Sequence, residues 1–245
     1  LSLHDILSLS LKDDKKVALT CTDPTVPVDE SNLVLKAVRA LEKRLRRRFG
    51  VRIHLEKKTP SGAGLGGGSS DAASVLTAIN EKLGHPLSLD ALGSVAAEVG
   101  SDVPFFLHRS VCDATGRGEH VTPVPFPWRL RFLLIKPSFG IPTPWAYQRW
   151  ASSRELQGVR YEPQICPWGE MVNDLERPVF EKHLHLACLK MWLLEQPQVA
   201  SALMSGSGAT MFAVLKDAAD ADALEAAARE YCGATTWIQQ AGMAV

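Results

Sequence analysis

The chain has 245 residues, which is enough for one large domain or two modest ones. Hydrophobic residues make up 46% and charged residues 22%, so the composition is that of a globular protein and excludes a disordered one. The formal net charge is zero, which argues against binding to nucleic acid or a membrane surface through overall charge. The five cysteines include no Cys-x-x-Cys pair, so a disulfide framework is not expected, and a reducing, cytoplasmic compartment is favoured. From the sequence we expect no membrane-spanning segment and no signal peptide.

The first segments alternate apolar and polar residues as strands do. The alternation runs from Leu7 to Leu11 and again from Val17 to Cys21, on either side of a polar turn. This pattern predicts a β-hairpin over residues 1–22. Apolar residues at helical spacing then predict a helix over residues 31–48, with Asn32 at its start as a cap.

A glycine-rich stretch follows the next predicted strand, residues 51–58. Five glycines fall between Gly62 and Gly68, and a helix is predicted over residues 69–83. Such a loop exposes backbone N–H groups, and the helix N-terminus adds partial positive charge, so the unit suits an anion such as a phosphate. Lys57 and Lys58 precede the loop and could approach phosphates, although lysines at a strand end are usually solvated.

Glycine loops have several chemistries. A P-loop requires a lysine after its last glycine, whereas Ser69 and Ser70 stand here, so that motif is excluded. Gly62, Gly64 and Gly67 match a dinucleotide fingerprint by letter, which keeps a nicotinamide-dependent enzyme open as an alternative. A tight turn without ligand is disfavoured because three consecutive glycines cost much conformational entropy on folding.

The next helix is predicted from Ser88, as its cap, to Gly100, its stop. Asp102 follows, and its place two residues before a proline is typical of a turn or cap residue. Residues 111–121 are predicted to form a hairpin. A proline-rich stretch ending at Pro127 marks the predicted boundary between a first domain, residues 1–127, and a second, residues 128–245.

The second half begins with a predicted buried strand at residues 130–136, a broken loop and a helix from Trp145 that carries Tyr147. Residues 158–169 are expected to be irregular, and helices are expected from Asn173 and over residues 184–195. Strands at 201–205 and 209–216 flank a glycine-containing turn, and a helix at 218–231 precedes a closing strand at 235–239. This order predicts an antiparallel α+β arrangement of the ferredoxin-like kind.

Several motifs in this order resemble a known family. They are the loop from Pro60 to Ala73 and the later stretches 100–106, 141–144, 173–176 and 204–210. The chain is similar to the GHMP kinases, and the triple glycine is similar to the branch that acts on 4-diphosphocytidyl-2-C-methyl-D-erythritol in non-mevalonate isoprenoid biosynthesis. The resemblance implies a two-domain GHMP fold with an α/β N-terminal and a ferredoxin-like C-terminal domain. It also implies transfer of a phosphoryl group from ATP, with Mg²⁺, to the 2-hydroxyl of that substrate.

The resemblance further implies roles for individual residues. Asp102 would be the catalytic carboxylate that contacts the substrate hydroxyl and takes its proton. Tyr147 would stack on the cytosine, although an aromatic on a helix is more often part of the core. The implied C-terminal glycine loop, which could equally be a plain β-turn, consists of Ser205, Gly206, Ser207 and Gly208. The implied ATP site consists of Pro60, Ser61, Gly62, Ala63, Gly64, Leu65, Gly66, Gly67, Gly68, Ser69, Ser70 and Asn32.

In the family, this aspartate pairs with a lysine on the first strand. Leu1–Asp5 is similar to the second strand region, so we expect this sequence to lack the strand with that lysine. Three hypotheses therefore remain: a small-molecule kinase, a nucleotide-binding relative without turnover, and a dinucleotide-dependent oxidoreductase. The expected partner is a small-molecule substrate, with no nucleic acid and no membrane, for a monomer or homodimer.

Overall fold

A computed structural model describes residues 1–243 of the chain. The contacts divide it into two compact units. One unit comprises His4–Ser61 and Gly66–Phe126, and the other comprises Leu1–Leu3, Gly62–Leu65 and the residues from Pro127 onward. The glycine-rich stretch therefore contributes to both units.

The first unit contains a three-stranded sheet in the order β1-β3-β2, built from β1 (Ile6–Lys12), β3 (Gly50–Glu56) and β2 (Val17–Cys21). β3 runs antiparallel to β1 and parallel to β2, so the predicted hairpin over residues 1–22 is wrong. The alternation located both strands, but β3 lies between them because Val51, Ile53 and Leu55, at most 2% exposed, belong in the centre. Pairing partners distant in sequence are not encoded in a local pattern.

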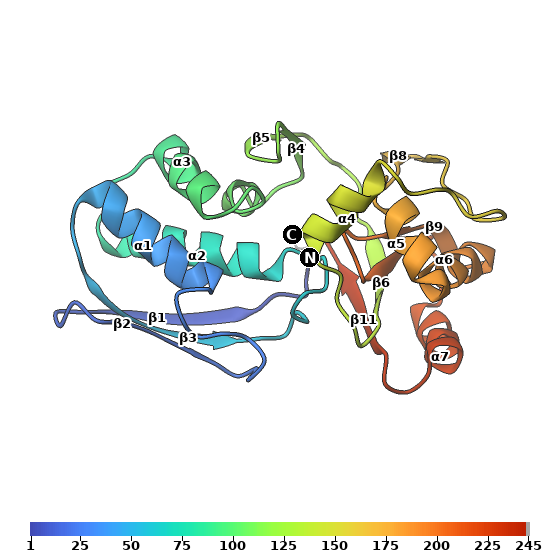
Figure 1. Ribbon diagram of the computed structural model, residues 1–245, viewed down its shortest axis with the longest axis horizontal. Helices are drawn as coiled ribbons and strands as arrows, with labels where there is room; N and C mark the ends of the chain where they lie inside the picture. Colours follow the sequence, from blue (N-terminus) through green and yellow to red (C-terminus); the bar gives the residue numbers. More distant parts are fainter. Residues whose placement is uncertain (244–245) are drawn as a thin grey trace. The chain divides into compact units, whose positions relative to one another are not determined.

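Helices cover one face of this sheet (Figure 1). They are α1 (Leu33–Leu45) and α2 (Gly67–Lys82), and α3 (Leu89–Val99) packs on these two helices. Apolar residues of all three helices join those of β3 in one hydrophobic core. Ser88 caps α3 by accepting a hydrogen bond from the Ala91 N–H, as predicted. A short 3₁₀ helix, η1 (Pro104–Leu107), follows Asp102. The predicted hairpin consists of β4 (Cys112–Thr115) and β5 (His120–Pro123).

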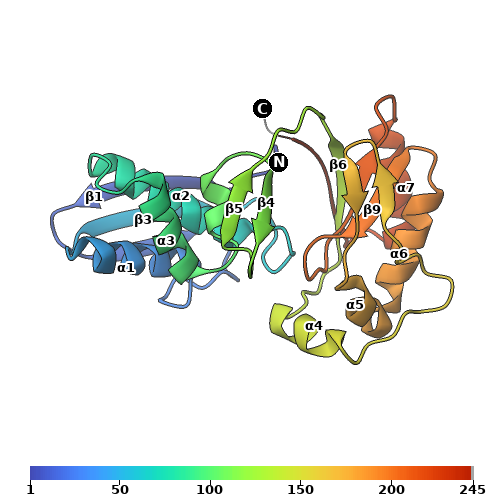
Figure 2. The same ribbon diagram turned by 90° about the horizontal axis from the view of Figure 1, so that it is seen from above.

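The second unit is an antiparallel sheet in the order β11-β6-β10-β9, with α6 and α7 on one face (Figure 2). Its strands are β6 (Arg131–Lys136), β9 (Val199–Met204), β10 (Met211–Leu215) and β11 (Trp237–Gly242). The helices α5 (Glu176–Lys182), α6 (Leu184–Glu195) and α7 (Ala221–Cys232) bury their apolar residues against it. The resulting β-α-β-β-α-β order is the ferredoxin-like arrangement expected from the sequence.

Several element boundaries differ from the sequence prediction, and three differences lie near the candidate site. α4 (Thr143–Trp150) begins two residues earlier than expected. Residues 158–169, expected to be irregular, contain most of a small hairpin of β7 (Gln164–Cys166) and β8 (Gly169–Met171). This hairpin is held against β9, because the buried Gln164 amide hydrogen-bonds to both the N–H and the carbonyl of Ala202. Finally, α5 begins at Glu176, three residues after Asn173. The Asn173 side chain makes tertiary hydrogen bonds and lies outside the helix.

Across residues 1–243, the helices are all too short or too polar to serve as a membrane span.

Candidate active site

The N-terminus of α2 is open to an anion. The helix begins at Gly67, so Gly67, Gly68, Ser69 and Ser70 form its first turn. Its cap residue, Gly66, has a positive φ of 69° and supplies no side-chain hydrogen bond. Backbone N–H groups at such an end lack intrahelical partners, and the helix dipole gives them partial positive charge. This end of α2 therefore has the donor set of a phosphate site.

The η1 segment, which follows Asp102 in the chain, packs against that helix end. A Cβ added to Gly66 would lie 2.6 Å from Cζ of Phe106, so the backbone at Gly66 lies directly against this ring. Asp102 itself is exposed, and the Ser101 hydroxyl donates to its Oδ1 at 3.4 Å. The start of α1 is also close, because Leu33 contacts the position that a Gly68 side chain would occupy at 3.6 Å. The first unit thus brings together Gly66–Ser70, the η1 segment and the start of α1.

Asn32 is engaged within the chain. Its Oδ1 accepts from the Val34 N–H at 2.8 Å, and its Nδ2 donates to the Pro27 carbonyl at 2.6 Å. The capping function expected of an asparagine at a helix start is therefore present. Its contact with a nucleotide stays a prediction.

A buried ion cluster lies near the N-terminal end of α2, and the sequence did not indicate it. Lys57 is only 6% exposed, so the expectation that it would be solvated is wrong. Its Nζ lies 2.5 Å from Oδ2 of Asp5 and 3.1 Å from Oδ2 of Asp71 in α2. The second oxygen of Asp5 accepts from the N–H groups of Lys58 and Thr59. The cluster ties the chain before the glycine loop to the helix after it, using an aspartate 52 residues from Lys57.

Two carboxylates share one lysine, and their pKa values diverge. Burial raises the pKa of Asp71 to about 6, and Lys57 only partly opposes this. Burial also acts to raise the pKa of Asp5. The hydrogen bonds from Lys57 and from the N–H groups of Thr59 and Lys58 outweigh it, so the pKa of Asp5 lies below its ordinary value. Near pH 5 the cluster therefore holds an ionised Asp5 and a protonated Asp71.

Asp71→Asn tests this assignment through stability. The folded state favours protonated Asp71, so its contribution is complete below its unfolded pKa of 3.8 and is lost as the pH rises through about 6. Since asparagine does not titrate, we expect the variant to gain up to about 3 kcal/mol relative to wild type between pH 4 and pH 7. Urea unfolding at several pH values measures this difference.

Asp14→Asn provides the control for that experiment. Hydrogen bonds from the Lys16 N–H and Arg52 hold the pKa of the exposed Asp14 below its ordinary value. Its contribution is therefore present above its unfolded pKa and is lost on acidification, which is the opposite sign. A pH-independent difference between wild type and Asp71→Asn would contradict the raised pKa of the buried Asp71.

The second unit places the C-terminal glycine turn against part of the first glycine loop. Residues Ser205–Gly208 lie in the connection between β9 and β10. The turn is closed by hydrogen bonds from the Ser205 N–H to the Thr210 carbonyl and from the Gly208 N–H to the Ser205 carbonyl. The Ser205 hydroxyl donates to the Gly64 carbonyl at 2.8 Å, and the Thr210 N–H donates to the Ala63 carbonyl at 3.2 Å. The two glycine motifs, 141 residues apart, are thus in direct contact.

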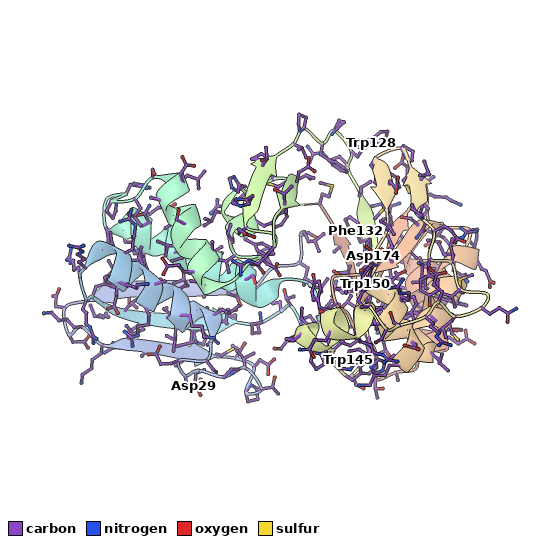
Figure 3. All side chains as sticks on the ribbon, turned by 45° about the horizontal axis from the view of Figure 1, so that its top comes forward. Asp29, Trp128, Phe132, Trp145, Trp150 and Asp174 are labelled. Carbon is purple, nitrogen blue, oxygen red and sulfur yellow. The ribbon has the colours of Figure 1, made fainter. Side chains whose placement is uncertain are left out.

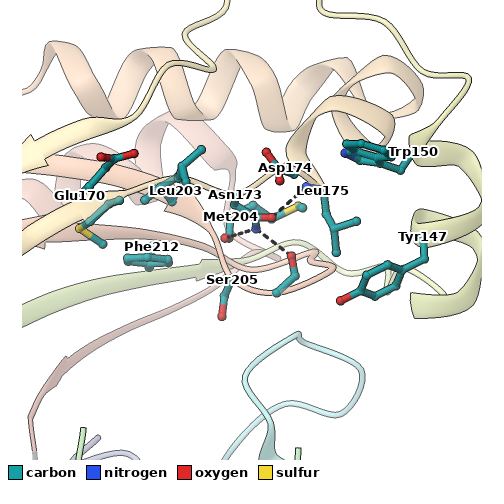
Figure 4. A pocket seen from close by; sticks show the side chains of 13 residues that line it. Tyr147, Trp150, Glu170, Asn173, Asp174, Leu175, Leu203, Met204, Ser205 and Phe212 are labelled. Atoms are coloured by element: carbon teal, nitrogen blue, oxygen red, sulfur yellow. Dashed lines mark hydrogen bonds between the residues drawn. The ribbon is translucent and has the colours of Figure 1, made fainter. Parts of the chain in front are cut away.

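A pocket of about 820 Å³ in the second unit extends from this turn (Figure 4). Tyr147, Trp150, Asp174, Ser205 and Phe212 are among the residues that line it. Tyr147 is 66% exposed, so its ring is available for stacking.

The helix that carries Tyr147 also carries Trp145 and Trp150 (Figure 3), and both rings contact cations of α5. Arg177 lies over the Trp150 ring at 4.7 Å, and Lys182 lies over the Trp145 ring at 4.4 Å. Such cation–π contacts stabilise the position of α4 and therefore of Tyr147.

Metal binding at the α2 end is compatible with its donors. Asp71 is committed to Lys57, which leaves the Ser69 and Ser70 hydroxyls and the exposed Asp102 carboxylate. Within residues 1–243, no group of three His, Cys, Asp or Glu side chains could hold a metal ion. Magnesium that accompanies a nucleotide takes most of its ligands from phosphates and water, with one or two from the protein, so these residues fit it.

Residues 32–110 match the family described as GHMP kinases N terminal domain, and residues 166–234 match GHMP kinases C terminal. A solved homoserine kinase from Cytophaga hutchinsonii shares the fold, with a TM-score of 0.72, 20% identity, and coverage of 98% of this chain and 86% of that one. Fold and glycine motifs together are those of the GHMP class of small-molecule kinases.

More specific similarity comes from proteins named 4-diphosphocytidyl-2-C-methyl-D-erythritol kinase. The protein of that name from Methylacidiphilum infernorum is 38% identical over 242 residues, which cover 98% of this chain and 84% of the relative. The one from Thermodesulfovibrio yellowstonii is 37% identical and covers 90% of this chain and 80% of the relative. A solved kinase of this kind has a TM-score of 0.75 at 28% identity, covering 99% of this chain and 87% of that one. The chain belongs to the 4-diphosphocytidyl-2-C-methyl-D-erythritol kinase family of GHMP kinases.

Proposed function

We propose that this protein transfers the γ-phosphoryl group of ATP to the 2-hydroxyl of 4-diphosphocytidyl-2-C-methyl-D-erythritol. The observation that carries the proposal is the uncapped glycine end of α2 packed against the η1 segment that follows Asp102. Phosphoryl transfer requires mainly positioning and charge stabilisation, and this arrangement supplies N–H donors and a carboxylate within one unit. The names of the relatives supply the substrate.

Each residue has a defined part in this proposal. The N–H groups of Gly67, Gly68 and Ser69 bind the outer phosphates, and the α2 dipole favours their negative charge. Asp102 orients the substrate hydroxyl and accepts its proton. Tyr147 stacks on the cytosine at the rim of the pocket. Bound Mg²⁺ supplies neutralisation of phosphate charge.

The test is ADP release by the full-length protein with ATP, Mg²⁺ and the diphosphocytidyl substrate. ADP formation that requires the substrate supports the proposal. ATP binding without ADP formation, in a protein that melts cooperatively, would instead support a nucleotide-binding relative. Binding of NAD in a fluorescence titration, with no ATP binding, would support the oxidoreductase alternative.

Tyr147→Ala tests the cytosine contact. Loss of a base-stacking ring costs about 1–3 kcal/mol, so we expect the KM for the substrate to rise about 5- to 150-fold. The KM for ATP should stay within about twofold, because the ring contacts the substrate base alone. Tyr147→Phe keeps the stacking face and should behave as wild type. Equal KM values for wild type and Tyr147→Ala would exclude this role.

A further inference from the structure

The motif Asn173–Glu176 has no direct part in the chemistry proposed above, yet its side chains hold the strand end that leads into the C-terminal glycine turn. Asn173 Nδ2 donates to the Met204 carbonyl at 2.7 Å and to the Gly206 carbonyl at 2.8 Å (Figure 4). Its Oδ1 accepts from the Leu175 N–H at 3.0 Å. One amide therefore uses both donor hydrogens to fix two carbonyls on either side of Ser205.

Glu176 fixes the same strand end from the other side. Its Oε1 accepts from the Met204 N–H at 2.8 Å, while Oε2 lies 2.5 Å from Nζ of Lys190. Both side chains of this ion pair are 1% exposed, and Lys190 also donates to the Arg160 carbonyl. The backbone of Met204 is thus held at its N–H by Glu176 and at its carbonyl by Asn173.

The position of the Ser205–Gly208 turn determines the position of Gly62–Leu65. Besides the two hydrogen bonds already described, the backbones are in close contact: a Cβ on Gly64 would lie 2.3 Å from the Ser205 carbonyl oxygen and 2.7 Å from that of Gly208. A Cβ on Gly206 would lie 3.3 Å from the Gly64 carbonyl oxygen. Because neither segment has space to slide, a displaced turn displaces the loop.

From these contacts we propose that Asn173 is a positioning residue for nucleotide binding. It locks Ser205 and Gly206 in place, and they set the conformation of Ala63 and Gly64 immediately before the phosphate-binding end of α2. The inference rests on the proposed function, since it assigns Asn173 to the same phosphate loop. Asn173 does not touch ATP; it acts through the turn.

The test is Asn173→Asp, studied by ATP binding with the full chain. The introduced carboxylate has no donors and faces two carbonyl oxygens, so the turn should detach and the Kd for ATP should rise about tenfold or more. A carboxyl next to carbonyl oxygens has a raised pKa, and its protonated form can donate one hydrogen bond. We therefore expect ATP affinity relative to wild type to recover partly between pH 8 and pH 5.5.

Gln164→Glu is the matched control. It makes the same amide-to-carboxylate change against the same strand, where Gln164 pairs with the N–H and carbonyl of Ala202. It should lower stability while the Kd for ATP stays within about threefold and shows no recovery at low pH. A structural effect alone would move both variants alike, so equal losses of affinity would overturn the proposal.

The remaining outcomes are also decisive. A wild-type protein that does not bind ATP refutes the proposed function, whereas a folded Asn173→Asp protein with wild-type affinity refutes only the role of Asn173. If Asn173→Asp fails to melt cooperatively, Ser205→Ala carries the test. It removes the hydrogen bond from the Ser205 hydroxyl to the Gly64 carbonyl and should raise the Kd for ATP about threefold to tenfold. Unchanged affinity in that variant would overturn the coupling between turn and loop.

Discussion

Replacing Asp102 with asparagine is expected to lower kcat by about 10²- to 10⁴-fold, the usual contribution of a positioned proton acceptor. Asparagine keeps the size of the side chain but cannot take the proton of the substrate hydroxyl. The affinity for ATP should stay within about threefold, because the N–H groups at the α2 end bind the phosphates in this proposal. ADP release and ATP binding, measured on the same preparation, separate the two effects.

The control for Asp102→Asn is Asp90→Asn. Asp90 lies in the first turn of α3, at the opposite end of the helix that leads to Asp102, and is exposed like Asp102. Both changes remove one surface carboxylate, so both should alter the free energy of unfolding by no more than about 0.5 kcal/mol. Wild-type kcat in Asp102→Asn, or an equal loss in Asp90→Asn, would exclude Asp102 as the proton acceptor.

The parts of the fold that the sequence predicted correctly are those with local causes. The α6 helix was expected over residues 184–195 and lies at Leu184–Glu195, and Ser88 caps α3 as its spacing indicated. The glycine stretch also leads into a helix as expected, although α2 begins two residues earlier, inside the glycine run. Helical periodicity, caps and glycine turns depend on residues only a few positions apart, so a single sequence contains their signal.

The parts that it did not predict depend on contacts between distant residues. The place of β3 between β1 and β2 is set by burial of the strand, and no pattern within residues 1–22 reveals it. The burial of Lys57 likewise requires Asp5 and Asp71 to be present as partners, and neither can be identified from the residues around the lysine. A buried charge without such partners would be strongly destabilising, which is why solvation was the natural expectation.

The candidate site also combines features that a local pattern predicts with features that depend on contacts between distant residues. The two glycine motifs could be recognised separately, but the hydrogen bond from Ser205 to Gly64 joins residues 141 positions apart and appears only in the folded chain. Asn173 is the clearest case, since an asparagine shortly before a helix suggests a cap. Its Oδ1 does accept from the Leu175 N–H, yet its Nδ2 reaches the carbonyls of Met204 and Gly206. Only the tertiary structure reveals these two hydrogen bonds from Nδ2.

Gly64→Ala is expected to be the most damaging single change in the glycine loop. Gly64 has a positive φ of 74°, which is strained for alanine. The added Cβ would also lie 2.3 Å from the Ser205 carbonyl oxygen, a backbone atom that cannot rotate away. We expect the free energy of unfolding to fall by about 3 kcal/mol or more, and the Kd for ATP to rise at least about tenfold, because the loop and the turn must separate.

Gly62→Ala isolates the conformational part of that effect, so its difference from Gly64→Ala gives the steric part. Gly62 lies in the same loop with a positive φ of 61°, but a Cβ there meets no atom within 4 Å. This variant should therefore show the conformational cost alone, about 1–2 kcal/mol, and bind ATP with nearly wild-type affinity. Urea unfolding and ATP titration of both variants give the comparison. If the two substitutions have the same effect, the contact between Gly64 and the Ser205–Gly208 turn does not hold the loop, and the coupling of the two glycine motifs must be abandoned.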